Sequence, residues 1–292
     1  IIGEGDVNPL DKKIPGENEL DALIYVPDGH EQYPAILICH GFLSGKEEFG
    51  ELPENIAKKG YVVMTFDFTG HGKSKGDRGY YRAISHLDDA ERALKKLWDQ
   101  EGSIKEQTAV IGHSMGTVAA LRLLSESKEG QKCKTGIIMA PVRKFVDMAG
   151  KFELEAYKFV AGIAWPVLLI TGKQMYLPFK VKTSNIFLDQ EMAKEFDKKN
   201  LLQKTMPINN YFYMIKQIDN EKFASKVEQK ILVLIGNQDK VVPPEGSRKV
   251  FKALKNQDKK LVEIENSGHS LMMDYSKDKV FLEIKDWLKE NI

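Results

Sequence analysis

Residues 112–116, Gly-His-Ser-Met-Gly, have the G-x-S-x-G spacing of a turn that presents a nucleophilic serine. An apolar run precedes this turn at 109–111, and a second apolar stretch follows at 118–124 with a spacing that a helix could bury. A strand, a sharp turn and a helix would hold the Ser114 hydroxyl at the tip of the turn. Glycines fit two residues either side, because a Cβ there would collide with the crossing backbone.

A serine hydroxyl is a poor nucleophile until a histidine takes its proton and a carboxylate orients that histidine. Among six histidines we predict that His269 is the base, since it lies in a polar loop directly after the last apolar strand. Catalytic groups gather at the carboxyl ends of parallel strands. His113 precedes the serine and should point away from it. His40 and His71 lie in glycine-containing loops, where a structural role is expected, and His30 and His86 have no supporting pattern.

The carboxylate should end a strand between the serine and the histidine, and Asp239 does so after the apolar run 231–235. A rival strand at 167–171 is followed by Gly-Lys-Gln, which offers no carboxylate. Asp274 and Asp67 stay as alternatives, although each lies in the wrong order or on the wrong side.

An oxyanion needs two preorganised N–H donors. Met115, the residue after the serine, is expected to supply one. The loop after the apolar run 35–39 is expected to supply the other from Phe42, with Gly41 allowing close approach of the backbone.

Several other functions are excluded by the same residues. Residues 70–74 resemble a phosphate-binding loop, but Asp67 stands where that loop requires a glycine, so we reject nucleotide binding. No two histidines have the spacing of metal ligands with a third ligand nearby, so no metal site and no cofactor are expected. A net charge of +1 gives no case for a nucleic-acid partner.

Short apolar strands alternate with helices along most of the chain. Strands are predicted at 20–26, 35–39, 61–66, 108–111, 136–141, 231–235 and 261–264, and helices at 48–59, 85–98, from 114 onward, at 245–254 and at 277–289. This alternation indicates an α/β fold with a mostly parallel sheet covered on both faces. Ser85 is the expected N-cap of its helix, and turn-forming residues dominate the first 20 positions.

Residues 142–226 interrupt this alternation and are rich in Phe, Tyr, Trp and Met. We predict that they form an inserted cap on a core of residues 1–141 and 227–292. Within the cap, 167–170 and 175–179 flank a Thr-Gly-Lys-Gln turn that suits a β-hairpin. Leu188, Met192 and Phe196 follow the spacing of one helix face, where core packing is the expected role.

The predicted cap carries 14 Lys and Arg against 9 Asp and Glu, a net charge of +5, so the remainder carries −4. A solvated lysine face is the preferred interpretation. Contact of the cap with a membrane or lipid interface and a homodimer through the edge of the hairpin are the alternatives.

The two cysteines and the first residue of the chain are the features that bear on the cellular location of the protein. Cys39 is expected to be a buried thiol, although one bridge to Cys133 stays open. The chain begins at Ile1 rather than at Met, so a processed or truncated product is expected. Two locations stay open: the cytoplasm, or the cell exterior or a membrane anchor if an N-terminal segment was removed.

Five motifs in order give the chain a resemblance to the α/β-hydrolase superfamily: HGF at 40–42, DFTGHGKS at 67–74, GHSMG at 112–116, GNQDKVVPP at 236–244 and SGH at 267–269. Within it, the chain resembles the small carboxylesterases that include cinnamoyl or feruloyl esterases and monoacylglycerol lipases. The resemblance implies an α/β-hydrolase fold, a triad of Ser114, Asp239 and His269, an elbow supported by Gly112 and Gly116, and an oxyanion hole at Phe42 and Met115.

We therefore expect a serine carboxylic-ester hydrolase that forms an acyl-enzyme. The apolar, aromatic cap favours short- to medium-chain acyl or aromatic-acid esters. Monoacylglycerol lipase and feruloyl esterase are the narrower activities left open. A serine peptidase of the same superfamily and a non-catalytic binding protein that kept the fold are the rival functions.

Overall fold

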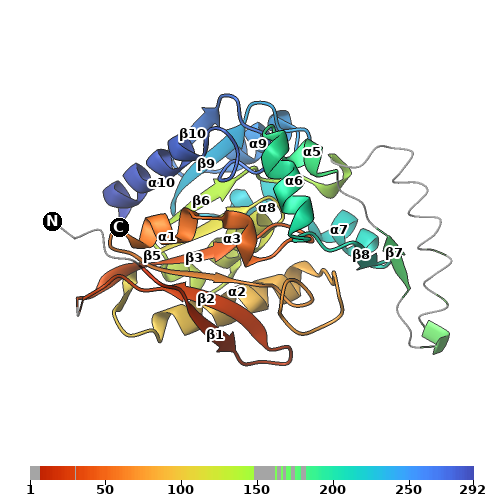
Figure 1. Cartoon of the computed structure of the whole chain (residues 1–292), viewed down its shortest axis with the longest axis horizontal. Coiled ribbons are helices and arrows are strands. Elements are labelled where there is room, and N and C mark those ends of the chain that lie inside the picture. Colours follow the sequence, from red (N-terminus) through yellow and green to blue (C-terminus); the bar gives the residue numbers. More distant parts are fainter. Residues whose placement is uncertain are drawn as a thin grey trace.

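The apolar runs of the sequence form one eight-stranded sheet with the order β1-β2-β4-β3-β5-β6-β9-β10 (Figure 1). The computed structural model describes residues 7–29, 31–147, 162, 166, 169–171, 175–178 and 182–292. β1 pairs antiparallel with β2, and β2 with β4, whereas the other neighbouring strands are parallel. The predicted mostly parallel sheet is therefore confirmed.

Seven of the eight strands lie where the apolar runs predict them. Their bounds are Leu20–Tyr25 (β2), Tyr33–Cys39 (β3), Val62–Phe66 (β4), Ser103–His113 (β5), Thr135–Met139 (β6), Lys230–Gly236 (β9) and Lys259–Ile264 (β10). β1 (Leu10–Ile14) falls in the stretch that the sequence indicates as turns. It is an edge strand with mostly exposed residues, so it lacks the apolar pattern of the inner strands.

Helices cover both faces of the sheet. α1 (Leu52–Ala57) and α10 (Lys277–Asn291) pack on one face, where Ile36 and Ile38 of β3 contribute to their apolar cluster. The opposite face is covered by α2 (Ala83–Trp98), α3 (Gly116–Glu126), α8 (Asn220–Ala224) and α9 (Pro244–Ala253), together with Leu37 of β3. Successive side chains of β3 point to opposite faces of the sheet, and both faces are buried. Its sequence is therefore a continuous apolar run.

Three predicted helix starts require correction. The expected helix at 48–59 is a short 3-10 turn, η1 (Lys46–Phe49), followed by α1. Ser85 is not an N-cap: α2 begins at Ala83 after Arg82, whose side chain caps no backbone N–H. The elbow helix α3 begins at Gly116 rather than at Ser114. Further 3-10 turns are η2 (Gly130–Lys132) and η3 (Phe145–Asp147).

Between β6 and β9 the described elements beyond η3 and α8 are β7 (Tyr176–Pro178), α5 (Thr183–Ile186), α6 (Gln190–Lys198), β8 (Thr205–Pro207) and α7 (Asn210–Gln217). The predicted hairpin of 167–170 with 175–179 is wrong where the structure describes it, because 169–171 are helical and β7 pairs antiparallel with β8. The rest of that hairpin lies outside the described residues.

The predicted core packing of the 188–196 stripe holds in part. Phe196 is buried against Phe187, with ring centroids 5.2 Å apart, and Met192 packs on the same small cluster. Leu188 precedes α6 and so does not share its face. In the described part of the chain, no helix has the length and hydropathy that crossing a membrane requires.

Two buried histidines form part of an aromatic cluster beside β4. The ring of His86 stacks on Phe68 with centroids 4.3 Å apart and meets Tyr81 and His71 edge-on. Burial lowers the pKa of His71 to about 3 and that of His86 well below its usual value. Both rings are therefore neutral in the folded protein, in line with the structural role expected for His71.

We expect the free energy of unfolding to fall as the pH drops below about 6.5. Below that pH, His71 and His86 bind protons in the unfolded chain but stay neutral in the folded protein. The unfolded state is therefore stabilised, and the free energy of unfolding that is present above pH 6.5 is lost as the pH falls. For His71, an unfolded pKa of 6.5 and a folded pKa of about 3 correspond to about 2 kcal/mol at pH 5. Urea titrations at pH 7 and pH 5 would measure the loss. His86→Phe keeps a ring on Phe68 and should reduce the difference; an unchanged difference would contradict this account.

Candidate active site

Ser114 occupies a strained turn between β5 and α3. Its φ is 51°, in the left-handed region that residues with a Cβ rarely adopt. The backbone N–H of Ser114 donates to the carbonyl of Met139 on neighbouring β6 at 2.9 Å, which helps to hold this conformation. α3 begins two residues later, so its N-terminal end lies beside the serine.

The flanking glycines are required by close backbone approach. A Cβ on Gly116 would lie 2.3 Å from the carbonyl oxygen of Cys39, and one on Gly112 would lie 2.8 Å from Cβ of Ala120. Both distances are too short for any side chain. This crowding agrees with the reason for which glycine is expected at the two positions.

The structure brings Ser114, His269 and Asp239 into one hydrogen-bonded line. His269 Nε2 lies 2.9 Å from Ser114 Oγ, and His269 Nδ1 lies 2.8 Å from Asp239 Oδ2. Since the carboxylate accepts a hydrogen bond from Nδ1–H, the other ring nitrogen, Nε2, carries the lone pair and faces the serine hydroxyl. All three residues are buried.

Asp239 is oriented by its own loop after β9. Its Oδ1 accepts the backbone N–H groups of Val241 and Val242, each at 2.8 Å, which leaves Oδ2 for His269. A carboxylate held at both oxygens has little freedom to rotate. The imidazole that it contacts is therefore fixed in direction as well as in tautomer.

The alternative acid Asp274 lies close to the same loop but has another role. Its buried carboxylate accepts the N–H of Gly268 at 2.8 Å and those of Leu188 and Asp189, each at 2.9 Å. These bonds join the loop that carries His269 to a segment between β6 and β9. Asp274 is thus a structural clamp, a role that the sequence does not indicate.

The predicted oxyanion loop passes directly over the elbow. A Cβ on Gly41 would lie 3.3 Å from Cβ of Ser114, so the loop backbone runs beside the nucleophile. His40 Nδ1 donates to the Gly41 carbonyl at 2.6 Å, while His40 Nε2 accepts the N–H of Phe68 at 2.9 Å. The Gly41–Phe42 peptide is therefore held through its carbonyl. Met115, the other predicted donor, is the N-cap residue of α3.

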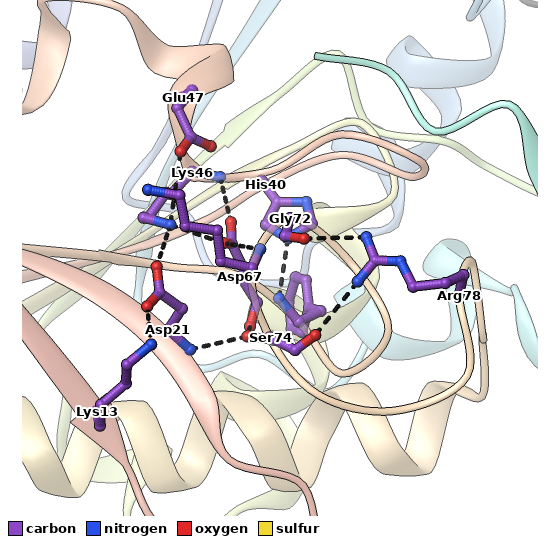
Figure 2. A network of polar contacts seen from close by, with 11 residues as sticks. Lys13, Asp21, His40, Lys46, Glu47, Asp67, Gly72, Ser74 and Arg78 are labelled. Atoms are coloured by element: carbon purple, nitrogen blue, oxygen red, sulfur yellow. Dashed lines mark hydrogen bonds and ion pairs between the residues drawn. The ribbon is translucent and has the colours of Figure 1, made fainter. Parts of the chain in front are cut away.

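A buried ion network holds Lys46, which follows this loop in the chain, as Figure 2 shows. Lys46 Nζ lies 2.6 Å from Asp21 and 2.7 Å from Asp67, and its side chain is 1% exposed. Asp67 also accepts the backbone N–H groups of Lys46 and Lys73, at 2.7 and 2.8 Å. Burial alone would lower the pKa of Lys46, but the charge of Asp67 and the hydrogen bonds to both carboxylates raise it. Asp67, an alternative acid in the sequence, is therefore occupied in holding two loops.

The segment between β6 and β9 contacts the same loops through hydrogen bonds. The N–H of Gln203 donates to the carbonyl of Leu43 at 2.7 Å. The Asn210 side chain accepts the N–H of Tyr81 at 3.1 Å. The backbone N–H of His269 donates to the carbonyl of Ile186 at 2.9 Å. These contacts place the segment at the carboxyl ends of the strands, beside the line of Ser114 and His269.

The other candidate ligands and histidines have different surroundings. Among the described residues no group of His, Cys, Asp and Glu side chains could hold a metal ion. Cys39 and Cys133 are buried free thiols, so the alternative of a bridge between them is wrong.

His30 lies outside the described residues. His113 does not simply point away: its ring centroid is 4.9 Å from that of His269.

We expect Lys46→Met to destabilise the protein by about 3–5 kcal/mol, because Asp67 would stay buried without a counter-charge and Asp21 would keep only the more exposed Lys13. Lys13→Met is the matched control: Lys13 contacts Asp21 as well, but its side chain is 57% exposed. Its loss should cost a small fraction of that amount. Chemical denaturation of both variants measures the difference, and equal losses would refute the assigned role of Lys46.

Comparison with known proteins places this site in a family. A model of the family described as serine aminopeptidase, S33, matches residues 30–276. The caffeoylshikimate esterase of Arabidopsis thaliana is 25% identical over 285 residues, 92% of this chain and 81% of that protein. The thermostable monoacylglycerol lipase of Bacillus sp. (strain H-257) is 23% identical over 256 residues, 82% of this chain and 84% of that protein.

The crystal structure of a monoacylglycerol lipase from Paleococcus ferrophilus superposes with a TM-score of 0.73 at 21% identity, over 92% of this chain and 98% of that one. The predicted α/β-hydrolase fold is thereby confirmed. With a family match over most of its length, the chain belongs to the serine aminopeptidase S33 family of esterase- and lipase-like α/β hydrolases.

Proposed function

We propose that the protein is a serine carboxylic-ester hydrolase with Ser114 as nucleophile, His269 as base and Asp239 as the orienting acid. The observation that carries this proposal is the unbroken line from Ser114 Oγ through His269 to Asp239, with contacts of 2.9 and 2.8 Å. A binding protein has no need of this line, which orients a lone pair on a hydroxyl in a strained turn.

In the first step, Ser114 Oγ bonds to the ester carbonyl carbon while its proton passes to His269 Nε2. Asp239 stabilises the imidazolium that forms. The negative charge develops on the former carbonyl oxygen, where the backbone N–H groups of Phe42 and Met115 would receive it. His269 then protonates the leaving alcohol as the ester C–O bond breaks, which leaves an acyl-enzyme.

In the second step, water attacks the acyl carbon as His269 takes one of its protons. The bond between this carbon and Ser114 Oγ then breaks, and His269 returns the proton to the serine. The acid leaves and the resting state is restored. No redox step and no cofactor enter this cycle.

The substrate class we propose is short- to medium-chain acyl or aromatic-acid esters. Support comes from the aromatic composition of residues 142–226, from the contacts of Ile186 and Gln203 with the loops of the proposed site, and from relatives named as a caffeoylshikimate esterase and a monoacylglycerol lipase. Peptide hydrolysis is the second candidate, favoured by the description of the matched family as serine aminopeptidases.

Ser114→Ala should lower kcat for p-nitrophenyl esters by about 10³-fold or more, because no other group can form the acyl-enzyme. Circular dichroism should be unchanged. A fluorophosphonate probe should label the wild type at Ser114 and leave the variant unlabelled. Retained turnover in the variant would remove Ser114 from the mechanism.

Asp239→Asn should lower kcat by about 10³–10⁴-fold, since the amide would favour the wrong His269 tautomer. Asp274→Asn should instead lower stability, because an amide has one acceptor oxygen for the N–H groups that the carboxylate binds. Kinetics per active site, counted by the fluorophosphonate, separate the two effects. A greater loss of kcat in Asp274→Asn would reassign the acid.

A substrate series tests the class directly. We expect higher kcat/KM for p-nitrophenyl esters of two to eight carbons and for methyl ferulate than for a sixteen-carbon ester. A monoacylglycerol tests the lipase activity. Preferential cleavage of aminoacyl anilides over every ester would favour the peptidase.

A further inference from the structure

A buried carboxylate and a buried imidazole lie beneath the proposed site and take no part in the steps above. Glu48 comes from η1 and is 6% exposed, whereas His113 ends β5 and is 3% exposed. His113 Nδ1 lies 3.0 Å from Glu48 Oε1, and His113 Nε2 lies 3.0 Å from the backbone carbonyl of His269.

The acceptors around His113 determine its protonation. A backbone carbonyl can only accept, so Nε2 carries a proton. Glu48 Oε1 accepts the N–H of Gly41 at 2.6 Å, as an ionised carboxylate does, and it also accepts a hydrogen bond from the Nδ1–H of His113. His113 is thus an imidazolium paired with a carboxylate.

The directions of the two pKa values agree with this charged pair. Burial alone would raise the pKa of Glu48, but the charge and hydrogen bond of His113 lower it. Burial alone would lower the pKa of His113, but the charge and hydrogen bond of Glu48 raise it. The charge of Asp239 also acts on His113 in the raising direction.

The other groups around the pair complete its surroundings. The ring of His269 lies 4.9 Å from that of His113 between centroids, and Phe49 approaches the same ring edge-on at 6.4 Å. His40 also acts on Glu48 in the direction that lowers its pKa, and His40 Nε2 accepts the backbone N–H of Phe68 at 2.9 Å. Asp239, which accepts a hydrogen bond from His269, is a further group whose charge acts on His113.

The pair touches three parts of the proposed machinery at once. Gly41, bound by Glu48, directly precedes Phe42 in the oxyanion loop. His113 directly precedes Ser114 in the elbow. The His269 carbonyl, bound by His113, belongs to the residue that carries the base. With His40 on the Gly41 carbonyl, both polar groups of the Gly41 backbone are held, so the direction of the Phe42 N–H follows from them.

We propose that Glu48 and His113 are positioning residues, whose ion pair fixes the oxyanion loop and the backbone of His269 relative to Ser114. This inference rests on the proposed function, because it concerns the geometry of that reaction. Desolvating two charges is costly, and an apolar pair of similar size would fill the space without that cost. An apolar pair could not bind the Gly41 N–H or the His269 carbonyl, and these hydrogen bonds are what the charged pair provides.

Glu48→Gln tests the charge, since the amide oxygen can still accept the Gly41 N–H. We expect kcat for p-nitrophenyl butyrate to fall by about 10- to 100-fold while KM stays within about 3-fold, as misplaced donors affect mainly the transition state. The alkaline limb of kcat/KM should also move to lower pH, because His113 without its carboxylate loses its proton earlier. Glu51→Gln, with a side chain that is 74% exposed, is the matched control and should change neither quantity.

Glu48→Asp keeps the charge and should restore part of the alkaline limb. A double-mutant cycle with His113→Gln measures the coupling: the double variant should lose less in kcat than the product of the single losses. Circular dichroism and the fluorophosphonate count of active sites correct each rate for misfolded protein. If Glu48→Gln does not fold, the pH profiles of Glu48→Asp and His113→Gln replace it. We expect an alkaline limb displaced to lower pH in Glu48→Asp, and the loss of the limb that depends on the His113 proton in His113→Gln.

Two failures are distinguishable. An active wild type whose kcat and alkaline limb are unchanged in these variants would overturn the positioning role and leave the proposed function intact. A wild type that neither hydrolyses esters nor reacts with the fluorophosphonate at Ser114 would overturn the proposed function and this inference with it.

Discussion

The close approach of the turn at 112–116 to the end of β3 is the constraint on which the site depends. The space that a Cβ on Gly116 would need is 2.3 Å from the carbonyl oxygen of Cys39 and 2.5 Å from that of His40. With no side chain there, the first turn of α3 packs directly on the strand that leads into the oxyanion loop. Ser114 and Gly41 are consequently neighbours, although they are more than seventy positions apart in the sequence.

Buried charges, each with its own partner, surround that contact. Lys46 lies between Asp21 and Asp67, Glu48 meets His113, and Asp274 binds backbone N–H groups. Such groups contribute little net stability, since desolvation offsets most of the attraction between them. Their directional bonds do restrict how the loops can move. The site therefore rests on polar networks between the strand ends, whereas apolar packing stabilises the sheet and helices around it.

The sequence predicts the central parts of this arrangement because their signals are local. Inner strands are continuous apolar runs, and Ser114 and Asp239 each follow one of them. His269 follows the edge strand β10, and the three residues occur in an order that suits the fold. Long-range pairing escapes such signals. β7 pairs with β8 across an intervening segment rather than with a neighbouring strand, and edge strand β1 has mostly polar, exposed residues.

The contacts of individual buried polar residues cannot be predicted from the sequence either. Glu48 in an acidic stretch reads as a helix-surface residue, yet the break between η1 and α1 turns it inward to His113. Asp274 stays an alternative to Asp239 in the sequence, although it follows His269 along the chain, and only the fold shows that its carboxylate accepts backbone N–H groups. Spacing along the chain carries no information on which side chain turns inward at a 3-10 turn.

Two of the contacts between the loops of the proposed site and the segment between β6 and β9 involve backbone atoms alone, and this has a consequence for the side chains at those positions. The Leu43 carbonyl accepts the Gln203 N–H, and the Ile186 carbonyl accepts the His269 N–H. Such bonds do not depend on the side chains at those positions, apart from proline as a donor. The side chains of Ile186 and Gln203 can therefore change while these two backbone bonds are retained, whereas the side chain of Asn210 is itself part of the attachment. At these two positions, the geometry of the proposed reaction does not depend on the side chains that this segment would offer to a substrate.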